Sequence, residues 1–328
     1  MTEFKRRSLI AAVGASAALS AVPRALSQIA NYPNRPIRIV IGFAPGGLTD
    51  AYGRLFADQI AAKLGQPCVV ENRPGAGGNI AIDSVVRAPA DGYTILGTTT
   101  GAVWQNRVLY RKLPFDLAKD IDPVCVFPSG PLVVVVPERL GARNWDEFVA
   151  WSRKNQSTMG SYAPASYPHV LAETLNKRLG ANMQVVHYKG EAPMWVDMGS
   201  GQLQVAVGSY QAATTVMNKG FRAIAVTGAS RSPKLPDTPT LLEQGLKAPI
   251  AALEGGLAFS MRSGTPLEIL EMLSRIAVEG NETPRAKALR ESFAIPTATG
   301  GRAEALRMWK EDAPIWIKEV EALGVKLD

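Results

Sequence analysis

The residues with the clearest chemical potential lie near the start of the chain, in the glycine-rich segment Gly42–Asp50. It follows Ile37–Ile41, a β-branched apolar run that predicts a buried strand of a covered parallel sheet. A helix is predicted next, with Thr49 or Asp50 as its N-cap. Such a turn directs unpaired backbone N–H groups and the positive end of the helix dipole toward the carboxyl end of the strand. It indicates a site for an anion such as a carboxylate, held by amides and not by an arginine; the alternative is a plain strand-to-helix connection.

A second turn of the same kind is predicted farther along the chain. The strand Met159–Tyr162 leads into Ala163–Pro168 and then a helix whose leucines recur every four residues, with Ser166 as the expected N-cap. Thr98–Thr100 and Gly208–Tyr210 also follow predicted strands, where parallel sheets present ligand-binding groups. The two turns and these two segments are therefore the candidate ligand-binding sites.

The elements that position these residues alternate between short apolar runs and helical patterns, which is typical of an α/β fold. Pro128–Pro131 interrupts the pattern and predicts a hinge before a second lobe. We expect a first lobe from 28–129, a second lobe from 130–252, and a return to the first lobe with C-terminal helices in 253–328. The predicted strands are Ile37–Ile41, Cys68–Val70, Tyr93–Leu96, Val124–Phe127, Leu132–Val136, Met159–Tyr162, Val185–Tyr188, Val205–Val207, Ala223–Val226 and Leu253–Phe259.

Residues 1–27 have the pattern of an export signal. Lys5-Arg6-Arg7 forms a basic start, Leu9–Leu19 a short apolar core, and Ala25–Ser27 a small-residue cleavage site. The paired arginines suit the twin-arginine route, and Sec export is the alternative. The apolar core falls short of the ~20 residues that a membrane span needs. The remaining protein is expected to be soluble and periplasmic.

Charge and composition argue against several functions. Without residues 1–27 the net charge falls from +7 to +4, because four basic residues and one acidic residue are lost. The other basic residues are scattered, which gives no support for nucleic-acid binding. Two histidines and two cysteines in separate contexts give no metal-ligand spacing. Cys68 and Cys125 are predicted either to form a disulfide in an oxidising compartment or to remain as two buried thiols.

Common enzyme and nucleotide motifs do not occur in this sequence. The glycine-rich segment Pro74–Gly78 lacks the lysine of a phosphate-binding loop and does not fit GxGxxG. No GxSxG, HExxH or CxxC motif occurs, and His169 and His187 have no partner motif, so a structural role is expected for both.

Several further segments match a known family. They include Val70–Gly78, Asp91–Thr94, Tyr188–Gly190 and Leu235–Thr240, together with the F-x-P-G-G-x-x-D pattern of Phe43–Asp50. Over essentially its whole mature length the chain resembles the periplasmic solute-binding receptors of tripartite tricarboxylate transporters, the Bug-type receptors. The resemblance implies a type II-like periplasmic-binding-protein fold, in which each of two lobes is a mostly parallel sheet flanked by helices, and the ligand lies in the cleft between them.

The resemblance also implies a function. Family members usually hold an organic acid through backbone amides and bridging waters from the first turn of each lobe, and pass it to an integral membrane permease. No cofactor and no metal is implied, and the expected receptor is a monomer. The chain departs from the family at Ala163–Ser166, where small glycine-rich turns are usual, at His187, where proline is usual, and near Glu254, where a tryptophan is expected. Pro164 lacks an N–H group, so the second turn has one donor fewer.

The leading hypothesis is thus a receptor that captures a small carboxylate and closes around it by hinge motion. The alternatives are a sensor that presents its ligand to a signalling partner, or a periplasmic enzyme. Asp50 is expected to cap its helix or to contact a ligand, and the tyrosines to line the cleft or simply to pack. The candidate ligand-binding residues are Phe43, Ala44, Gly46, Gly47, Thr49, Asp50, Thr99, Thr100, Ser161, Tyr162, Ala163, Ser166, Tyr167, Ser209 and Tyr210.

Overall fold

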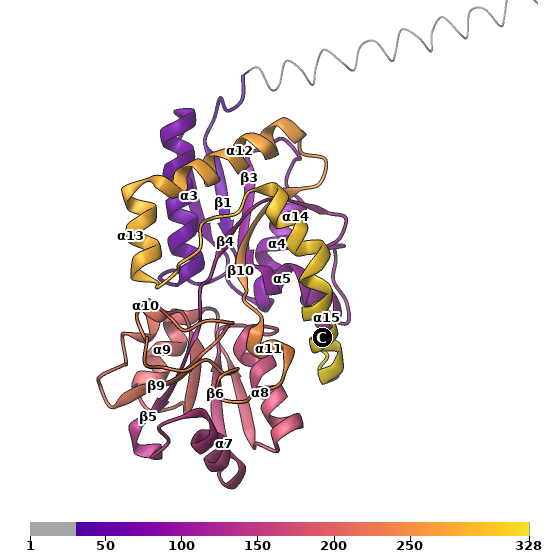
Figure 1. The fold of residues 1–328 in the computed structure, drawn as a ribbon. Coiled ribbons are helices and arrows are strands. Elements are labelled where there is room, and N and C mark those ends of the chain that lie inside the picture. The colour runs from indigo at the N-terminus through magenta and orange to yellow at the C-terminus, as the bar shows by residue number, and fades with distance from the viewer. Residues whose placement is uncertain (1–30, 328) are drawn as a thin grey trace, which may run out of the picture.

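The computed structural model describes residues 31–327, and the predicted export signal lies outside them. It contains two five-stranded sheets, one in each lobe, with helices packed around both (Figure 1). None of the helices in residues 31–327 combines the length and apolar character that a membrane span requires.

The first sheet has the strand order β2-β1-β3-β10-β4. β1 pairs in parallel with β2 and β3, whereas β10 pairs antiparallel with β3 and β4. Four of the five strands therefore run in the same direction. The strands are β1 (Ile37–Ile41), β2 (Cys68–Asn72), β3 (Thr94–Thr99), β4 (Ile121–Pro128) and β10 (Gly256–Arg262).

The second sheet repeats this arrangement in the order β7-β6-β8-β5-β9. β6 pairs in parallel with β7 and β8, and β5 pairs antiparallel with β8 and β9. In each sheet the odd strand is the one that follows a crossing between lobes, since β5 enters the second lobe and β10 returns to the first. The strands are β5 (Val133–Pro137), β6 (Ser157–Ser161), β7 (Met183–His187), β8 (Val205–Gly208) and β9 (Phe221–Val226).

Helices cover both sheets (Figure 1). Buried apolar side chains fill the space between the helices and the sheets. In the first lobe β1 and β3 pack beneath α3, and α12 packs against α3 and β4. The helices of this lobe are α3 (Leu48–Leu64), α4 (Asn79–Val86), α5 (Thr100–Trp104), α6 (Asn106–Leu109), α12 (Leu267–Glu279), α13 (Pro284–Ser292) and α14 (Arg302–Glu311). Those of the second are α7 (Trp145–Lys154), α8 (Tyr167–Leu179), α9 (Glu191–Gly199), α10 (Tyr210–Ala213) and α11 (Pro249–Ala252). Short 3-10 turns lie at Ala76–Gly78, Glu138–Leu140 and Gly280–Glu282.

The last helix, α15 (Ala313–Leu323), connects the two lobes (Figure 1). It packs against α8 and α11 of the second lobe and against α5 and α6 of the first. Glu319 on α15 forms an ion pair with Arg178 on α8 at 3.3 Å. Leu327 donates its backbone N–H to the carbonyl of Leu109, at 2.8 Å, which fixes the end of the chain to the first lobe. The C-terminal helix thus bridges the junction between the lobes.

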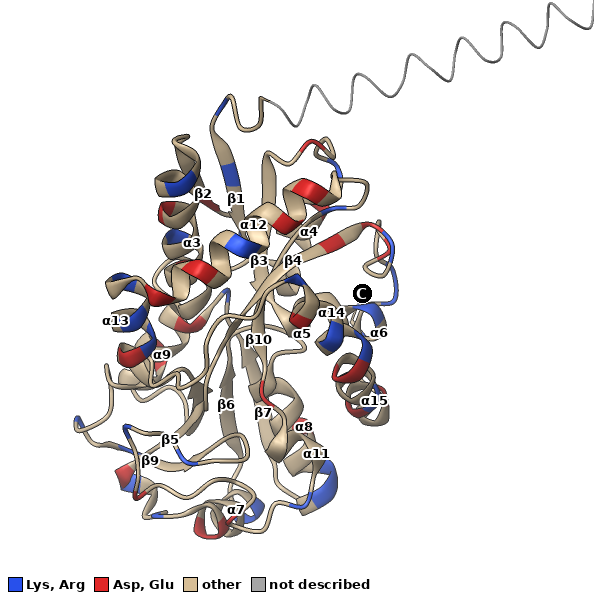
Figure 2. Cartoon of the chain, turned by 45° about the horizontal axis from the view of Figure 1, so that its top comes forward, with Lys and Arg blue, Asp and Glu red and all other residues tan. Residues whose placement is uncertain are grey.

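Charged side chains of both signs are interspersed over the outer helices (Figure 2). Arg307 on α14, for example, pairs with Glu304 and Glu311, each at 2.8 Å. Exposed ion pairs of this type contribute about 0.2–1 kcal/mol each, so the stability of the fold rests mainly on its buried apolar side chains.

The two cysteines are free thiols, and the sheet explains why they do not pair. Cys68 is on β2 and Cys125 on β4, which form opposite edges of the first sheet with three strands between them. At about 4.8 Å per strand the two backbones are roughly 19 Å apart, far beyond the ~7 Å limit of a disulfide. Of the two alternatives, the structure supports unpaired thiols.

Candidate ligand-binding site

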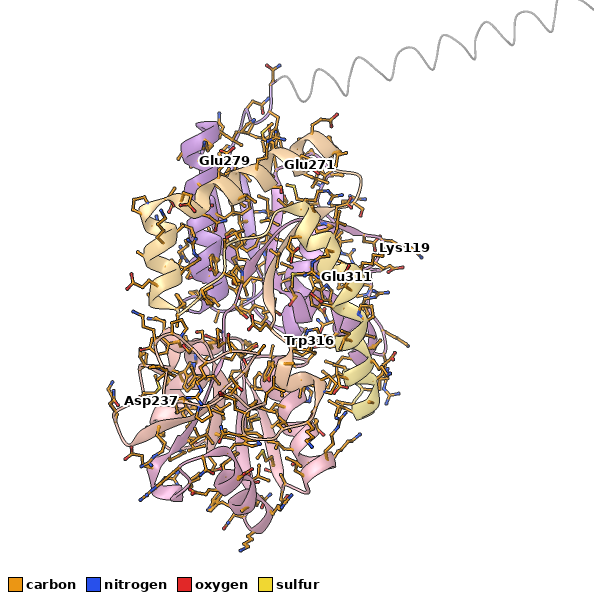
Figure 3. All side chains as sticks on the ribbon, viewed as in Figure 1. Lys119, Asp237, Glu271, Glu279, Glu311 and Trp316 are labelled. Carbon is orange, nitrogen blue, oxygen red and sulfur yellow. The ribbon has the colours of Figure 1, made fainter. Side chains whose placement is uncertain are left out.

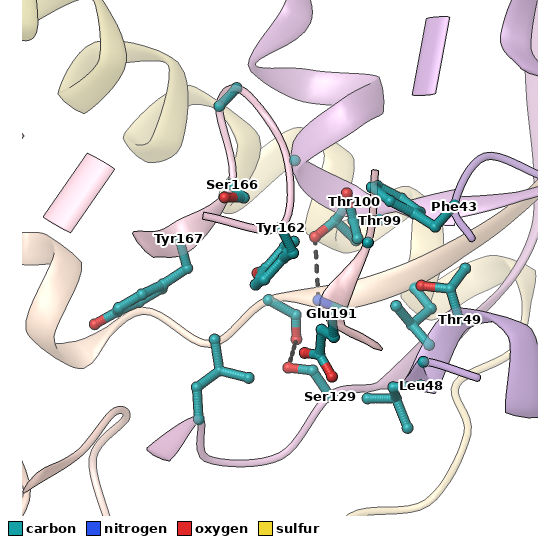
Figure 4. A pocket seen from close by; sticks show the side chains of 18 of the residues that line it. Phe43, Leu48, Thr49, Thr99, Thr100, Ser129, Tyr162, Ser166, Tyr167 and Glu191 are labelled. Carbon is teal, nitrogen blue, oxygen red and sulfur yellow. Dashed lines mark hydrogen bonds between the residues drawn. The ribbon is translucent and has the colours of Figure 1, made fainter. Parts of the chain in front are cut away.

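A cavity lies between the two lobes, close to the carboxyl ends of β1, β3 and β6 (Figure 4). It encloses about 750 Å³ of space that protein atoms do not fill, part of it continuous with solvent. The residues that line it are Phe43, Ala44, Gly47, Leu48, Thr49, Thr99, Thr100, Gly101, Gln105, Ser129, Leu132, Tyr162, Ala165, Ser166, Tyr167, Gly190, Glu191, Gly255, Gly256, Leu257 and Trp316.

The first turn presents the N-terminus of α3 to this cavity. The helix begins at Leu48 with Gly47 as its N-cap, and no side chain caps it. Gly47, Leu48 and Thr49 all line the cavity, and first-turn amides have no partner within their own helix. The expectation that Thr49 or Asp50 is the N-cap is wrong, because the helix starts before both residues. An uncapped helix N-terminus that faces a cavity can accept an anion.

Asp50 supports the first turn from behind and does not line the cavity. Its carboxylate accepts a hydrogen bond from the Gly46 amide at 3.1 Å, from Asn72 at 3.0 Å, and two from Arg54. Burial alone would raise the pKa of Asp50, but the bonds from Arg54, Asn72 and Gly46 outweigh it and hold the pKa below its ordinary value. Asp50 is therefore an ionised brace that fixes the shape of the turn.

The second turn, between β6 and α8, uses most of its polar groups internally. Ser166 is the N-cap residue, as expected, but its hydroxyl bonds with Ser161 at 2.8 Å and does not cap the helix. The Ser166 amide donates to the Ala163 carbonyl at 3.2 Å. Ala165 adopts a left-handed backbone with φ of 57° and donates its N–H to Nδ1 of His169 at 3.1 Å. The N-terminus of α8 also lacks a side-chain cap, but Pro168 in its first turn has no N–H group, so this turn offers fewer free donors than the first.

Two threonines at the end of β3 form another part of the wall. Thr99 accepts a hydrogen bond from the Ala102 amide at 3.2 Å and so caps α5. Thr100 accepts one from the Gly256 amide at 3.1 Å, which joins β3 to the start of β10 (Figure 4). Both side chains line the cavity.

Of the three tyrosines expected in the cleft, Tyr162 and Tyr167 line the cavity. Tyr167 donates its hydroxyl to the Ile250 carbonyl at 2.6 Å, and its ring meets the edge of Trp316 with centroids 5.9 Å apart. Tyr162 lies beside it (Figure 4). Tyr210 instead packs against the apolar cluster of the second lobe. Burial raises the pKa of Tyr162 and Tyr167 well above the ordinary value, so both are neutral hydroxyls at physiological pH.

The cavity brings together nine of the fifteen predicted residues. Gly46, Asp50, Ser161, Ala163, Ser209 and Tyr210 lie outside its lining, although Asp50, Ser161 and Ser209 bond to residues near or in it. The nine that line it are Phe43, Ala44, Gly47, Thr49, Thr99, Thr100, Tyr162, Ser166 and Tyr167.

Sequence reasoning missed four cavity residues with polar side-chain atoms, Glu191, Gln105, Trp316 and Ser129, the last of which lies in the predicted hinge. Glu191 follows Gly190 at the start of α9, just after β7, so the rule that singled out the other strand ends would also have found it. Gln105 lies between two short helices, and Trp316 comes from α15 at the junction of the lobes (Figure 3). Their places depend on tertiary packing and left no local signal.

The charges around the cavity are unusual for an anion site. Its lining contains no lysine or arginine, and its one charged side chain is Glu191. Burial raises the pKa of Glu191, partly offset by hydrogen bonds from Ser209. Within residues 31–327 no group of three His, Cys, Asp or Glu side chains is placed to hold a metal ion. Any hydrogen bonds to an anion in this cavity would therefore come from backbone amides and neutral side-chain donors.

Comparisons with known proteins by sequence and by structure point to the same receptor family. A family model described as the tripartite tricarboxylate transporter family receptor matches residues 53–323. Protein BugT of Bordetella pertussis is 32% identical over 295 residues, covering 89% of each chain. A structure of R. palustris Rpa4515 with adipate is 30% identical, with a TM-score of 0.82 over 89% of this chain and 98% of the other. The periplasmic binding protein BugD is 26% identical, with a TM-score of 0.81 over 90% of this chain and 99% of the other.

Proposed function

We propose that this chain, which belongs to the tripartite tricarboxylate transporter receptor family, captures a small organic acid in the cavity between its lobes and delivers it to a membrane permease. The observation that carries the proposal is the uncapped N-terminus of α3 at Gly47, which faces the cavity. A carboxylate there would accept hydrogen bonds from backbone amides and be stabilised by the helix dipole. The similar structure that contains adipate supports a carboxylate as the ligand.

The rest of the cavity suits a small acid with an apolar body. Leu48, Leu132 and Leu257 contribute aliphatic surface, and Thr49 and Thr99 contribute hydroxyls near the α3 N-terminus. Ligand pockets are commonly apolar with a few placed polar groups that fix orientation. No bond of the ligand needs to be broken in this role, and we propose a receptor without enzymatic activity.

Closure of the lobes would hold the ligand. The Ala44 amide of the first turn donates to the Lys189 carbonyl of the second lobe at 2.7 Å, so the lobes are in contact beside the cavity. The chain crosses between the lobes after β4 and before β10, and we place the lobe boundaries near 129/130 and 252/253. Rotation about these crossings would open the cavity, and the closed form would be the one that the permease recognises.

This role implies that the protein acts in the periplasm. Residues 1–27 would direct export and be removed, and the receptor would act as a monomer that meets integral membrane permease subunits.

A thermal-shift screen of the purified exported protein tests the proposal. The panel contains mono-, di- and tricarboxylates, aromatic acids and their amides. A ligand at one hundred times its Kd should add ~2.7 kcal/mol, which is a rise in Tm of roughly 5 to 10 °C for a protein of this size. A saturable rise with one class of acid is expected. An unchanged Tm with every acid in the panel would contradict carboxylate capture.

A further inference from the structure

We propose that Gln105 binds the end of the ligand that lies away from the N-terminus of α3, by donating a hydrogen bond from its side-chain amide to an oxygen there. The receptor then prefers acids with a second oxygen-bearing end over simple monocarboxylates of the same length. This inference rests on the proposed function, because it assumes that the first carboxylate binds at the N-terminus of α3.

The side chain of Gln105 is buried in the cavity wall without a hydrogen bond. Gln105 lies between α5 and α6, lines the cavity and is only 2% exposed. Its Oε1 is completely buried and bonds to nothing in residues 31–327. Its Nε2 also bonds to nothing in this range, but it is not completely buried. Buried polar groups in folded proteins are nearly always paired, so an amide with neither atom paired beside a cavity indicates a partner that arrives with the ligand.

The contacts of Gln105 place it beside the second turn. Gln105 donates its backbone N–H to the Gly101 carbonyl at 2.8 Å, so the two residues are one helical turn apart. A Cβ at Gly101 would lie 3.2 Å from Oε1 of Gln105 and 3.5 Å from the carbonyl oxygen of Ala165 in the second turn. A Cβ at Gly47, the N-cap of α3, would instead meet Glu191. Gln105 and the N-terminus of α3 therefore border different parts of the cavity.

Figure 4 shows the same separation. Tyr167, which directly follows the second turn, lies on one side of the cavity, and Leu48 and Thr49 lie on the opposite side. Trp316 meets the ring of Tyr167 and belongs to α15, which packs against both α5 and α6. Nε1 of Trp316 is a second buried N–H donor that bonds to nothing in the described residues. The side of the cavity with Tyr167 thus carries two unpaired N–H donors.

Two unpaired N–H donors without a cation suit an oxygen acceptor. Neither Gln105 nor Trp316 ionises, and no lysine or arginine lines the cavity. A side-chain amide donates readily to carbonyl and carboxylate oxygens, and its hydrogen bonds to charged acceptors are the stronger ones. A methyl group at the same place would leave the amide unpaired, and a site built to hydrogen-bond a ligand discriminates against the analogue that lacks the bonding group. The distal end of the preferred ligand is therefore a carboxylate or an amide.

Titration calorimetry with ligands of matched length tests the role of Gln105. The probes are succinate, glutarate and adipate, their monoamides, and butanoate, pentanoate and hexanoate, in which a methyl group replaces the second carboxylate. For at least one length the wild-type protein should bind the dicarboxylate or its monoamide about tenfold or more tightly than the monocarboxylate. Gln105→Leu should lose this preference and keep the wild-type affinity for the monocarboxylate, because leucine has a similar volume and no polar atom. Gln105→Glu keeps the shape but replaces the donor with an acceptor, so it should lose the preference for the dicarboxylate.

Gln59→Leu is the matched control, since it removes another buried glutamine of the first lobe, whose Nε2 donates to the Gly280 carbonyl at 3.1 Å outside the cavity lining. It should have a lower Tm and keep the wild-type preference. Unliganded Gln105→Leu should have a Tm at least as high as the wild type, because an apolar group replaces an unpaired buried amide.

Three results would overturn the inference and leave carboxylate capture intact. They are equal binding of the matched ligands by the wild type, a preference that survives in Gln105→Leu, and a clear fall in the Tm of unliganded Gln105→Leu, which would make the amide a structural group. Failure of every probe to bind would instead contradict the proposed function, and the inference would fall with it.

Discussion

The two turns that face each other across the cavity follow equivalent strands, β1 and β6, yet they differ in what they offer a ligand. The first turn leaves the N-terminus of α3 uncapped and relies on Asp50 for support from outside the cavity. In the second turn, Ala165 donates to His169, and the Ser166 hydroxyl bonds with Ser161. Both helices lack a side-chain cap, so the difference lies in the loops before them, and we propose that the first turn binds the anion while the second forms a wall.

The largest expected effect comes from blocking the first turn. Gly47→Val should weaken binding of the best acid by about a thousandfold, or ~4 kcal/mol, because its methyl groups would cover the free amides. A Cβ at Gly47 meets Glu191 only at ordinary contact distance, 3.8 Å, and Gly47 has an extended backbone, so the fold should persist. Ala62→Val, at an exposed position of the same helix, is the matched control. Titration calorimetry that showed unchanged affinity in Gly47→Val would remove the first turn from the site.

The second expected effect is a pH dependence of stability that originates behind the second turn. Burial, together with the neighbouring His187, lowers the pKa of His169 from 6.5 to about 4. Between these values the unfolded chain binds a proton that the folded chain does not, so the free energy of unfolding falls as the pH falls. The contribution of neutral His169 to the free energy of unfolding is fully present above pH 6.5, and about 3 kcal/mol of it is lost by pH 4.

Denaturant unfolding across this pH range measures the effect. His169→Asn should show a shallower decline than the wild type, because asparagine has no proton to bind and can still accept from the Ala165 amide. Parallel curves for the two proteins would show that His169 is not the group responsible. The first turn has no histidine, so we expect it to contribute no comparable decrease in the free energy of unfolding as the pH falls.

The smallest expected effect tests whether the second turn is only a wall. Ser166→Ala removes the hydroxyl that bonds with Ser161 and should lower the free energy of unfolding by about 1 kcal/mol, with less than a tenfold change in affinity. Ser152→Ala is the control, since it removes a buried hydroxyl on α7 that bonds to the Val149 carbonyl, away from the cavity. Both variants should lose similar stability. A hundredfold loss of affinity in Ser166→Ala alone would mean that the second turn binds the ligand directly.

Much of the fold could be predicted because its strands are short, apolar and separated by clear turn signals. Ile37–Ile41 matches β1 residue for residue, and the other nine predicted strands overlap their observed counterparts. The prediction of mostly parallel sheets agrees with the structure, but each observed sheet also contains one antiparallel strand. Local pattern could not show this, since strand direction in a two-lobed chain depends on where the backbone crosses between lobes.

The site was predicted less completely, for a physical reason. Strand-to-helix turns carry a local signal in glycine, proline and small polar residues, and that signal led to Gly47, Thr99 and Ser166. Gln105 and Trp316 reach the cavity through packing of α15 and the short helices against both lobes. The N-cap of α3 was misplaced because threonine and aspartate are preferred caps, whereas here the carboxylate of Asp50 reaches back to Gly46.

The most direct test of the account is a crystal structure of the protein with the acid that stabilises it most in the thermal-shift screen. The account predicts a ligand carboxylate within about 3 Å of the backbone amides of Gly47, Leu48 or Thr49, or joined to them by one ordered water. A carboxylate bound instead at the second turn, with no direct or water-mediated contact to the N-terminus of α3, would contradict the central claim.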